Sequence, residues 1–337
     1  MTVVTPTRGR ARLLSEALDS VAAQTLGDFE HFVVADCEDA ETTRLMSART
    51  AADPRVTYLV REGAEGGANV CRNIGLRRAG ADLVVFLDDD DRLAPGCLAG
   101  RVELMRRNPD LDFAVFGAEV FVADLGDLGL RYHDLAPGDD LLRFLSLDCP
   151  WQTSGPIWRR AWLERLGGFC ERLASLQDLE LHVRALCRRP RYLVSREIDH
   201  GVRAHHDGAR TSQRHFVDAD LIRRSEAVPS LLLAEVERAG LLTWSRHRAL
   251  IGLAYGAAEN WARIGRLGEA LRAWGEGAKA MRAPATIAAT GAVALALTRA
   301  EGRGGLGGRL VNKWKGRVRF RQEPELTPAR LVPAPGE

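Results

Sequence analysis

The chain has 337 residues, of which 46% are hydrophobic and 27% charged, the balance of an ordinary soluble globular protein. Its 47 basic and 45 acidic residues leave a formal charge of +2, without the basic excess typical of nucleic-acid binding. No apolar run reaches the ~20 residues that span a bilayer, and no basic and apolar leader predicts secretion. The six scattered cysteines form no Cys-x-x-Cys pair, which favours neither a zinc site nor disulfides and fits the cytoplasm.

Strand and helix signals alternate over roughly the first 120 residues. Apolar, β-branched runs predict strands at 2–5, 31–35, 56–60 and 83–87, and apolar residues at helical spacing predict helices from 13 and over 69–79. Continuous apolar runs are typical of parallel strands buried on both faces. We therefore expect an α/β fold with an open, mostly parallel sheet flanked by helices.

The pattern changes twice further along the chain. From 111 to 210 it is less regular, with strands predicted at 113–116, 119–122 and 190–194 and helices at 161–166 and 177–186. Beyond 216 the chain favours helix, and the spacing of Tyr255, Trp261 and Trp274 resembles one tetratricopeptide-type helix pair. We expect an α/β domain over 1–215, an α-helical appendage over 216–300, and a glycine-rich hinge, basic segment and proline-containing tail over 301–337.

The basic segment, 303–321, carries seven basic residues and no acidic one, with Trp314 and Phe320 interleaved. Basic residues near an anionic leaflet contribute about 1 kcal/mol each, so one interpretation is peripheral contact with the inner face of the membrane. The other is that the aromatic residues pack against the helical region, because charge runs are usually solvated faces.

Four consecutive carboxylates, Asp88 to Asp91, follow the predicted strand 83–87, and Asp36 follows the strand 31–35. Ligands of open parallel sheets bind beyond the carboxyl ends of the strands. Capping the next helix needs only one or two acids, at about 0.3–1 kcal/mol each. A site for Mg²⁺ or Mn²⁺ with phosphate groups explains the whole run, since these cations take oxygen ligands.

Ordered motifs over residues 3 to about 210 resemble the family 2 glycosyltransferases, which have the GT-A fold. Each motif is weak alone, and the specific signal is their order along the chain. The motifs are Val3-Val4-Thr5-Pro6-Thr7 with Arg10, Gln24-Thr25, Asp28-Phe29-Glu30, Val33-Val34-Ala35-Asp36, Gly66-Gly67-Ala68-Asn69 with Arg72-Asn73-Ile74-Gly75-Leu76, Asp88-Asp89-Asp90-Asp91 with Pro95, Trp158-Arg159-Arg160, Gly167-Gly168-Phe169 and Gln177-Asp178.

The resemblance implies transfer of a sugar, with inversion, from a nucleotide-sugar donor to a hydroxyl of a carbohydrate, lipid-linked or other acceptor. The donor base is expected to be uracil, with thymine and guanine as alternatives, and the carboxylate of Asp36 is expected to bind it. A divalent cation on the pyrophosphate is expected at Asp90 and His205. The other residues that the resemblance places at the nucleotide are Pro6, Thr7, Arg10, Arg72, Asp88 and Asp89. Arg72 also fits an ordinary arginine on a helix surface.

On the acceptor side, the resemblance makes Asp178 the general base, which takes the proton of the attacking hydroxyl. The residue before it, often acidic in the family, is Gln177, and we expect Glu180 to be exposed. A plain helix N-cap is the alternative role for Asp178. Trp151 and Gln152 are expected near the acceptor, although an aromatic residue there also fits packing.

Two further features qualify the resemblance. Ala35 stands where the family commonly has a second aspartate, and Arg203 precedes two histidines, of which the spacing favours His205 for the metal or phosphates. Two other functions remain open, a nucleotidyltransferase that makes activated sugars and a non-catalytic GT-A scaffold whose helical region binds a partner. The first would be expected to open with a glycine-rich phosphate loop, and only Gly9 is present there.

Overall fold

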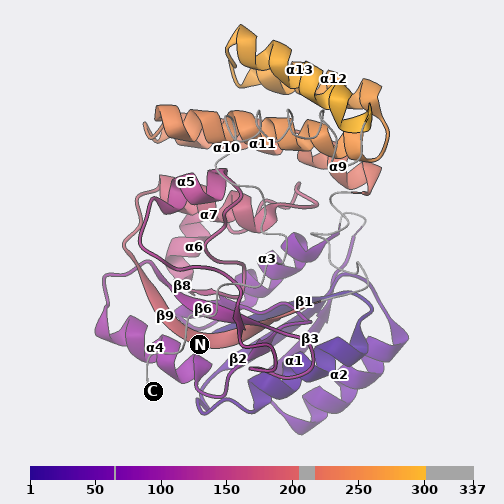
Figure 1. Ribbon diagram of the computed structural model, residues 1–337. Helices are drawn as coiled ribbons and strands as arrows, with labels where there is room; N and C mark the ends of the chain where they lie inside the picture. Colours follow the sequence, from indigo (N-terminus) through magenta and orange to yellow (C-terminus); the bar gives the residue numbers. More distant parts are fainter. Residues whose placement is uncertain (64–65, 205–216, 301–337) are drawn as a thin grey trace.

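In the computed structural model, residues 1–63, 66–204 and 217–300 are described. A central sheet carries helices on both faces, and further helices form an outer layer above α5 and α7 (Figure 1). The sheet order is β3-β2-β1-β4-β8-β6-β9-β5, with β7 paired to β6. The strands are β1 (Thr2–Thr7), β2 (Glu30–Ala35), β3 (Val56–Val60), β4 (Leu83–Phe86), β5 (Arg92–Leu93), β6 (Phe113–Phe121), β7 (Leu130–Arg131), β8 (Pro156–Arg159) and β9 (Tyr192–Arg203).

The half of the sheet built from β1 to β4 is parallel, as predicted. All six residues of β1 are buried, since β2 and β4 flank it and helices cover its faces. Parallel pairing brings the carboxyl ends of β1, β2 and β4 to one edge of the sheet. That edge carries Thr7, Asp36 and the acid loop, which we define as Asp88–Asp91.

The other half mixes parallel and antiparallel pairs. The two strands predicted at 113–116 and 119–122 form one strand, β6, whose register with β9 shifts around Gly117. A Cβ at Gly117 would lie 3.0 Å from the carbonyl oxygen of Glu197, so the glycine permits this close approach. Strand β9 is longer than predicted because residues 195–197 are polar and give no apolar signal.

The helices of the α/β part cover both faces of the sheet. Helix α1 buries Leu14, Ala17, Leu18 and Val21, the spacing of one helical face. The helices are α1 (Ala11–Ala22), α2 (Ala40–Ala52), α3 (Ala68–Arg78), α4 (Cys97–Arg107), α5 (Asp140–Leu145), α6 (Arg160–Leu166) and α7 (Gln177–Cys187).

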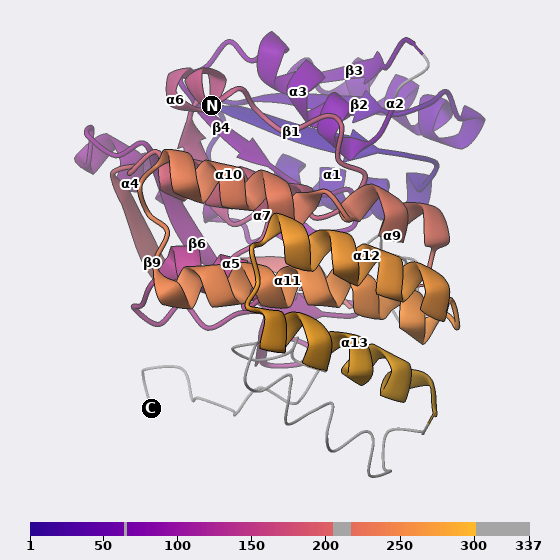
Figure 2. The same ribbon diagram turned by 90° about the horizontal axis from the view of Figure 1, so that it is seen from above.

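Between Ala219 and Ala300 the chain is largely helical, as its composition predicts. Figures 1 and 2 show α10 and α11 lying over the α/β part, with α12 and α13 stacked on the outer side of α11; we call these helices together the helical layer. Helix α10 packs on α7 and α11 on α5, so Leu179 and Leu181 of α7 share one core with Leu232 and Val236 of α10. These helices are α9 (Ala219–Ser225), α10 (Val228–Arg238), α11 (Trp244–Arg263), α12 (Leu267–Ala280) and α13 (Ala285–Ala300).

In the part of the chain that the structure describes, two ion pairs join this helical layer to the α/β part. Arg188 lies 3.0 Å from Glu235, and Arg246 lies 3.1 Å from Asp139. Among the residues described, none of the helices is long and apolar enough to cross a membrane. The basic segment 303–321 lies outside the described residues, so both of its interpretations stay predictions, as do the two boundaries between the three predicted regions.

Helix α3 packs directly on β1, which generates the first prediction. A Cβ at the buried Gly75 would overlap the side chain of Val4. We expect Gly75→Ala to cost about 1–3 kcal/mol through overpacking, measured as a lower midpoint of thermal unfolding. The control is Gly100→Ala in α4, where nothing lies within 4 Å, which should stabilise by about 0.5–1 kcal/mol. Equal midpoints for the two variants would contradict this packing.

Candidate active site

In the acid loop, Asp89 ties the loop to β1. It is 1% exposed, and its carboxylate accepts hydrogen bonds from Thr7 Oγ1 at 2.7 Å and from Arg10 Nη2. Burial raises the pKa of Asp89 to about 6, against the opposing charge of Arg10. Its bonds run to β1 and to the residue before α1, and this gives Asp89 a structural role.

The other three acids turn their carboxylates toward one another. Asp88, Asp90 and Asp91 each offer an oxygen, and these atoms all lie within 4.8 Å of one another. A set made only of carboxylate oxygens suits a hard cation such as Mg²⁺ or Mn²⁺. Arg10 Nη1 donates to Asp90 at 3.0 Å, so the nucleotide-side arginine and the expected metal ligand are in contact.

Arg72 is buried in this site. Its side chain is 3% exposed, its Nη2 donates to Asp88 at 2.6 Å, and its guanidinium carbon lies 5.0 Å from the centre of the Phe169 ring. The surface-helix alternative is therefore wrong. The buried Nε of Arg72 has no hydrogen-bond partner within the described residues, and such groups are rare in native structures. That donor is available to an anionic ligand.

Asp36 lies where β2 ends, and it already has partners. Its Oδ1 accepts from the backbone N–H of Gly67 at 2.6 Å and from Arg61 Nε at 2.9 Å. Gly67 has a φ of 127°, and a Cβ at Gly66 would lie 2.5 Å from Asp36 Oδ1, which explains the glycine turn. The sequence analysis missed Arg61, although it directly follows the strand 56–60 at the same edge of the sheet.

Asp178 lies in the first turn of α7. The N-cap of this helix is Leu176, held at a φ of 56°, so the N-cap alternative for Asp178 is wrong. Burial raises the pKa of Asp178; the backbone N–H of Leu179 and the charge of Arg72 oppose the shift, and the charge of Asp88 adds to it. A carboxylate with a raised pKa near the donor-side residues is suited to accept a proton.

Glu180 differs from its prediction. It is 6% exposed, because Arg184 one turn later donates to both of its carboxylate oxygens, at 2.6 and 2.9 Å. Arg184 also donates to the carbonyl oxygens of Leu166 and Gly168. The pair therefore fixes α7 against the Gly167-Gly168 turn, and Asp178 is the acid of this turn without an arginine ion pair among the contacts described.

Of the two residues predicted on the acceptor side, Trp151 packs in the core and Gln152 makes polar contacts. Trp151 is 3% exposed and packs against Phe113, Phe144 and His182. Gln152 bonds His200 Nε2 at 3.0 Å, and a small pocket borders both Trp151 and Gln152. No described contact tests a role in acceptor binding.

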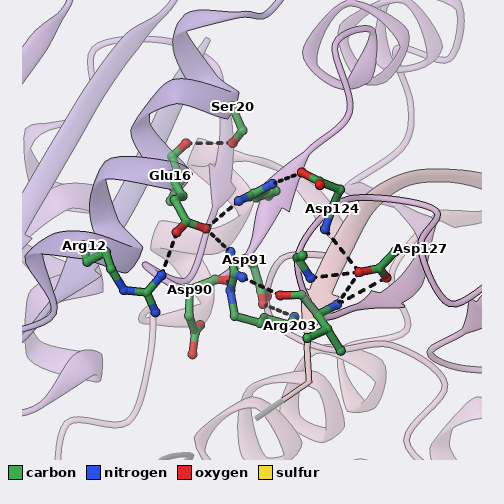
Figure 3. A network of polar contacts seen from close by, with 12 residues as sticks. Arg12, Glu16, Ser20, Asp90, Asp91, Asp124, Asp127 and Arg203 are labelled. Atoms are coloured by element: carbon green, nitrogen blue, oxygen red, sulfur yellow. Dashed lines mark hydrogen bonds and ion pairs between the residues drawn. The ribbon is translucent and has the colours of Figure 1, made fainter.

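Arg203, the last residue of β9, is 7% exposed and fully bonded. Its Nε donates to the carbonyl oxygen of Asp90 at 3.0 Å, and its backbone N–H donates to Asp91 Oδ1 at 3.2 Å. Figure 3 shows it between the acid loop and Glu16 of α1, a residue that the sequence analysis missed. His205 and His206 lie outside the described residues. Buried Pro6 belongs to β1, beside Thr7.

Comparison with known proteins finds a family similar to the first part of the chain. Residues 2–145 match the model described as Glycosyl transferase family 2. A stretch of 99 residues is 33% identical to GalNAc(5)-diNAcBac-PP-undecaprenol beta-1,3-glucosyltransferase of Campylobacter jejuni, covering 29% of this chain and 32% of that protein. The chain thus spans about a third of that relative.

Two solved structures share the fold. S. aureus TarS 1-349 in complex with UDP-GlcNAc has a TM-score of 0.66 at 18% identity, over 95% of this chain and 93% of that one. Mannosyltransferase PcManGT from Pyrobaculum calidifontis, in complex with GDP-Man and Mn²⁺, has a TM-score of 0.53 at 20% identity, over 94% and 84%. Residues 2–145 are thus similar to glycosyltransferase family 2, and the described chain shares the GT-A-type fold of these two structures.

Proposed function

We propose that this chain transfers a sugar from a nucleoside diphosphate donor, a UDP-sugar, to an acceptor hydroxyl with inversion. The observation that carries the proposal lies at the sheet edge with the acid loop, which we call the donor edge. There, one oxygen each of Asp88, Asp90 and Asp91 lies within 4.8 Å of the others, beside the buried Arg72, whose Nε–H has no hydrogen-bond partner among the described residues. The TarS structure, which shares the fold, holds UDP-GlcNAc. The two other functions considered, a nucleotidyltransferase and a non-catalytic scaffold, account less well for these residues.

On the donor side, Asp88, Asp90 and Asp91 would hold Mg²⁺ or Mn²⁺. When bound, such a cation neutralises charge that develops on the leaving diphosphate. Arg72 and Arg10 add fixed positive charge at the same edge, and Asp36, with Arg61 beside it, would bind the base. The three arginines are held in place before substrate arrives, which is the condition for electrostatic stabilisation of a leaving group.

On the acceptor side, Asp178 takes the proton from the acceptor hydroxyl. The oxygen attacks the anomeric carbon on the face opposite the diphosphate, the new carbon–oxygen bond forms, and the bond to the phosphate oxygen breaks with its electron pair. One displacement inverts the configuration and needs a single base. The C. jejuni relative is named for a saccharide linked to PP-undecaprenol. We propose that the acceptor of this chain is also lipid-linked.

Asp90→Asn tests the donor edge. The change removes one anionic oxygen from the carboxylate cluster, so we expect UDP binding in the presence of Mn²⁺ to weaken at least about tenfold, or 1.4 kcal/mol. Isothermal titration of UDP with and without Mn²⁺ measures it. The matched control is Asp110→Asn, whose side chain is 78% exposed in a surface pair, and it should bind as wild type does. Unchanged Mn²⁺-dependent binding by Asp90→Asn would contradict the site.

Asp178→Asn tests the base. We expect kcat to fall by about 10²–10⁴-fold with UDP binding intact, measured as release of UDP from the donor. Because the raised pKa belongs to a group that must be ionised to act, wild-type kcat should fall as the pH drops through that pKa. The residual kcat of Asp178→Asn should not show this fall at low pH.

Protein stability provides a second measurement on the same variant. A carboxyl with a raised folded pKa favours folding only when protonated, so its ionised form costs stability at neutral pH. Asp178→Asn should therefore unfold at the same or a higher temperature than wild type. The control is Asp220→Asn, an exposed acid in the first turn of α9. Turnover by Asp178→Asn within a few-fold of wild type would exclude Asp178 as the base.

A further inference from the structure

Glu16, on α1, gathers three arginines from distant parts of the chain. Its Oε2 accepts from Arg92 Nη2 and from Arg203 Nη2, each at 2.5 Å, and its Oε1 accepts from Arg12 Nη1 at 3.0 Å (Figure 3). The pKa of Glu16 lies below its ordinary value. Partial burial acts to raise this pKa, but the hydrogen bond from Arg92 and the charge of Arg203 lower it by more. Glu16 is therefore an anion at neutral pH.

Two of these arginines need that anion. The guanidinium carbons of Arg92 and Arg203 lie 5.3 and 4.5 Å from the centre of the same Phe121 ring. Like charges held this close repel, and a carboxylate bonded to both offsets the repulsion. Arg92 has a second acid, Asp124, at 3.2 Å, whereas the described ion pair of Arg203 is with Glu16.

Arg203, held by Glu16, in turn hydrogen-bonds the acid loop. Its Nη2 is held by Glu16 and its Nη1 by the carbonyl oxygen of Val122, at 2.7 Å. A planar guanidinium fixed at two corners can direct its Nε only one way, and here Nε points to the carbonyl oxygen of Asp90. The backbone N–H of the same residue holds Asp91 Oδ1. Arg203 thus bonds two of the three residues that form the carboxylate cluster.

We propose that Glu16 is a positioning residue: by fixing Arg203 it sets the spacing of the Asp90 and Asp91 carboxylates, and so the affinity of the loop for a divalent cation and a nucleoside diphosphate. The proposal rests on the proposed function. It goes beyond that function because the contacts described for the Glu16 side chain are with arginines, and Glu16 acts through one of them, Arg203, which lies 187 positions away in the sequence.

Glu16→Gln tests the proposal, since the amide keeps the shape and loses the charge. We expect Mn²⁺-dependent UDP affinity to fall about tenfold, while the unfolding temperature changes by only a few degrees. The matched control is Arg12→Gln. The Arg12 side chain also pairs with Glu16 but is 81% exposed, so its removal should leave the affinity for UDP unchanged. Wild-type affinity in Glu16→Gln would overturn the proposal.

A double variant separates positioning from a general structural role. Arg203→Lys keeps the charge but cannot donate in three fixed directions, so it should lose about as much affinity as Glu16→Gln. If Glu16 acts through Arg203, adding Glu16→Gln to Arg203→Lys should cause no further loss. A further tenfold loss would overturn the proposal. Should Glu16→Gln fail to fold, Arg203→Lys alone carries the affinity test.

Hydrogen exchange without metal or nucleotide keeps this inference distinct from the proposed function. The backbone amides of Asp88–Asp91 should exchange faster in Glu16→Gln than in wild type, and those in Arg12→Gln should not. If wild type bound UDP no better with Mn²⁺ than without, the proposed function would fail, and the exchange of this loop would still decide whether Glu16 positions it. Equal exchange in all three proteins would overturn the inference.

Discussion

The constraint on which the rest of the site depends is the repulsion among four adjacent carboxylates beyond β4. Each carboxylate is bonded by a fixed positive charge or a hydrogen-bond donor. Arg10 and Thr7 bond Asp89, Arg10 also bonds Asp90, Arg72 bonds Asp88, and the backbone N–H of Arg203 bonds Asp91. These partners come from β1, α3, β9 and the turn before α1, so the fold brings them together from distant parts of the chain. The loop is therefore shaped before any ligand binds, which is the basis of electrostatic preorganisation.

The helical layer supports the second half of the site. Helix α7 carries Asp178 and lies between the sheet and α10, with Leu179 and Leu181 in the core that both parts share. A base must stay within hydrogen-bond reach of its substrate, and a helix packed on both sides moves little. The Glu180–Arg184 pair adds a polar restraint on the same turn. The appended helices thus help to hold the first turn of α7.

The parallel half of the fold was predictable because its strands are continuous apolar runs, and the predicted strand 56–60 matches β3. Strand β9 was predicted too short, because its middle is polar and its pairing partner, β6, is far away in sequence. The acid loop and Asp178 were visible as motifs. Glu16 and Arg61 were not, because an acid on a helix or an arginine after a strand carries no local sign of its distant partner.

We propose above all that the acid loop and the buried Arg72 form the donor-phosphate site. The most direct measurement is a crystal structure of the protein grown with UDP and Mn²⁺, with anomalous scattering used to locate the manganese. The account predicts one manganese peak bounded by Asp88, Asp90 and Asp91, with a phosphate oxygen within hydrogen-bond distance of Arg72 Nε. UDP bound in the crystal with no manganese at these carboxylates, or with Arg72 Nε far from the diphosphate, would contradict it.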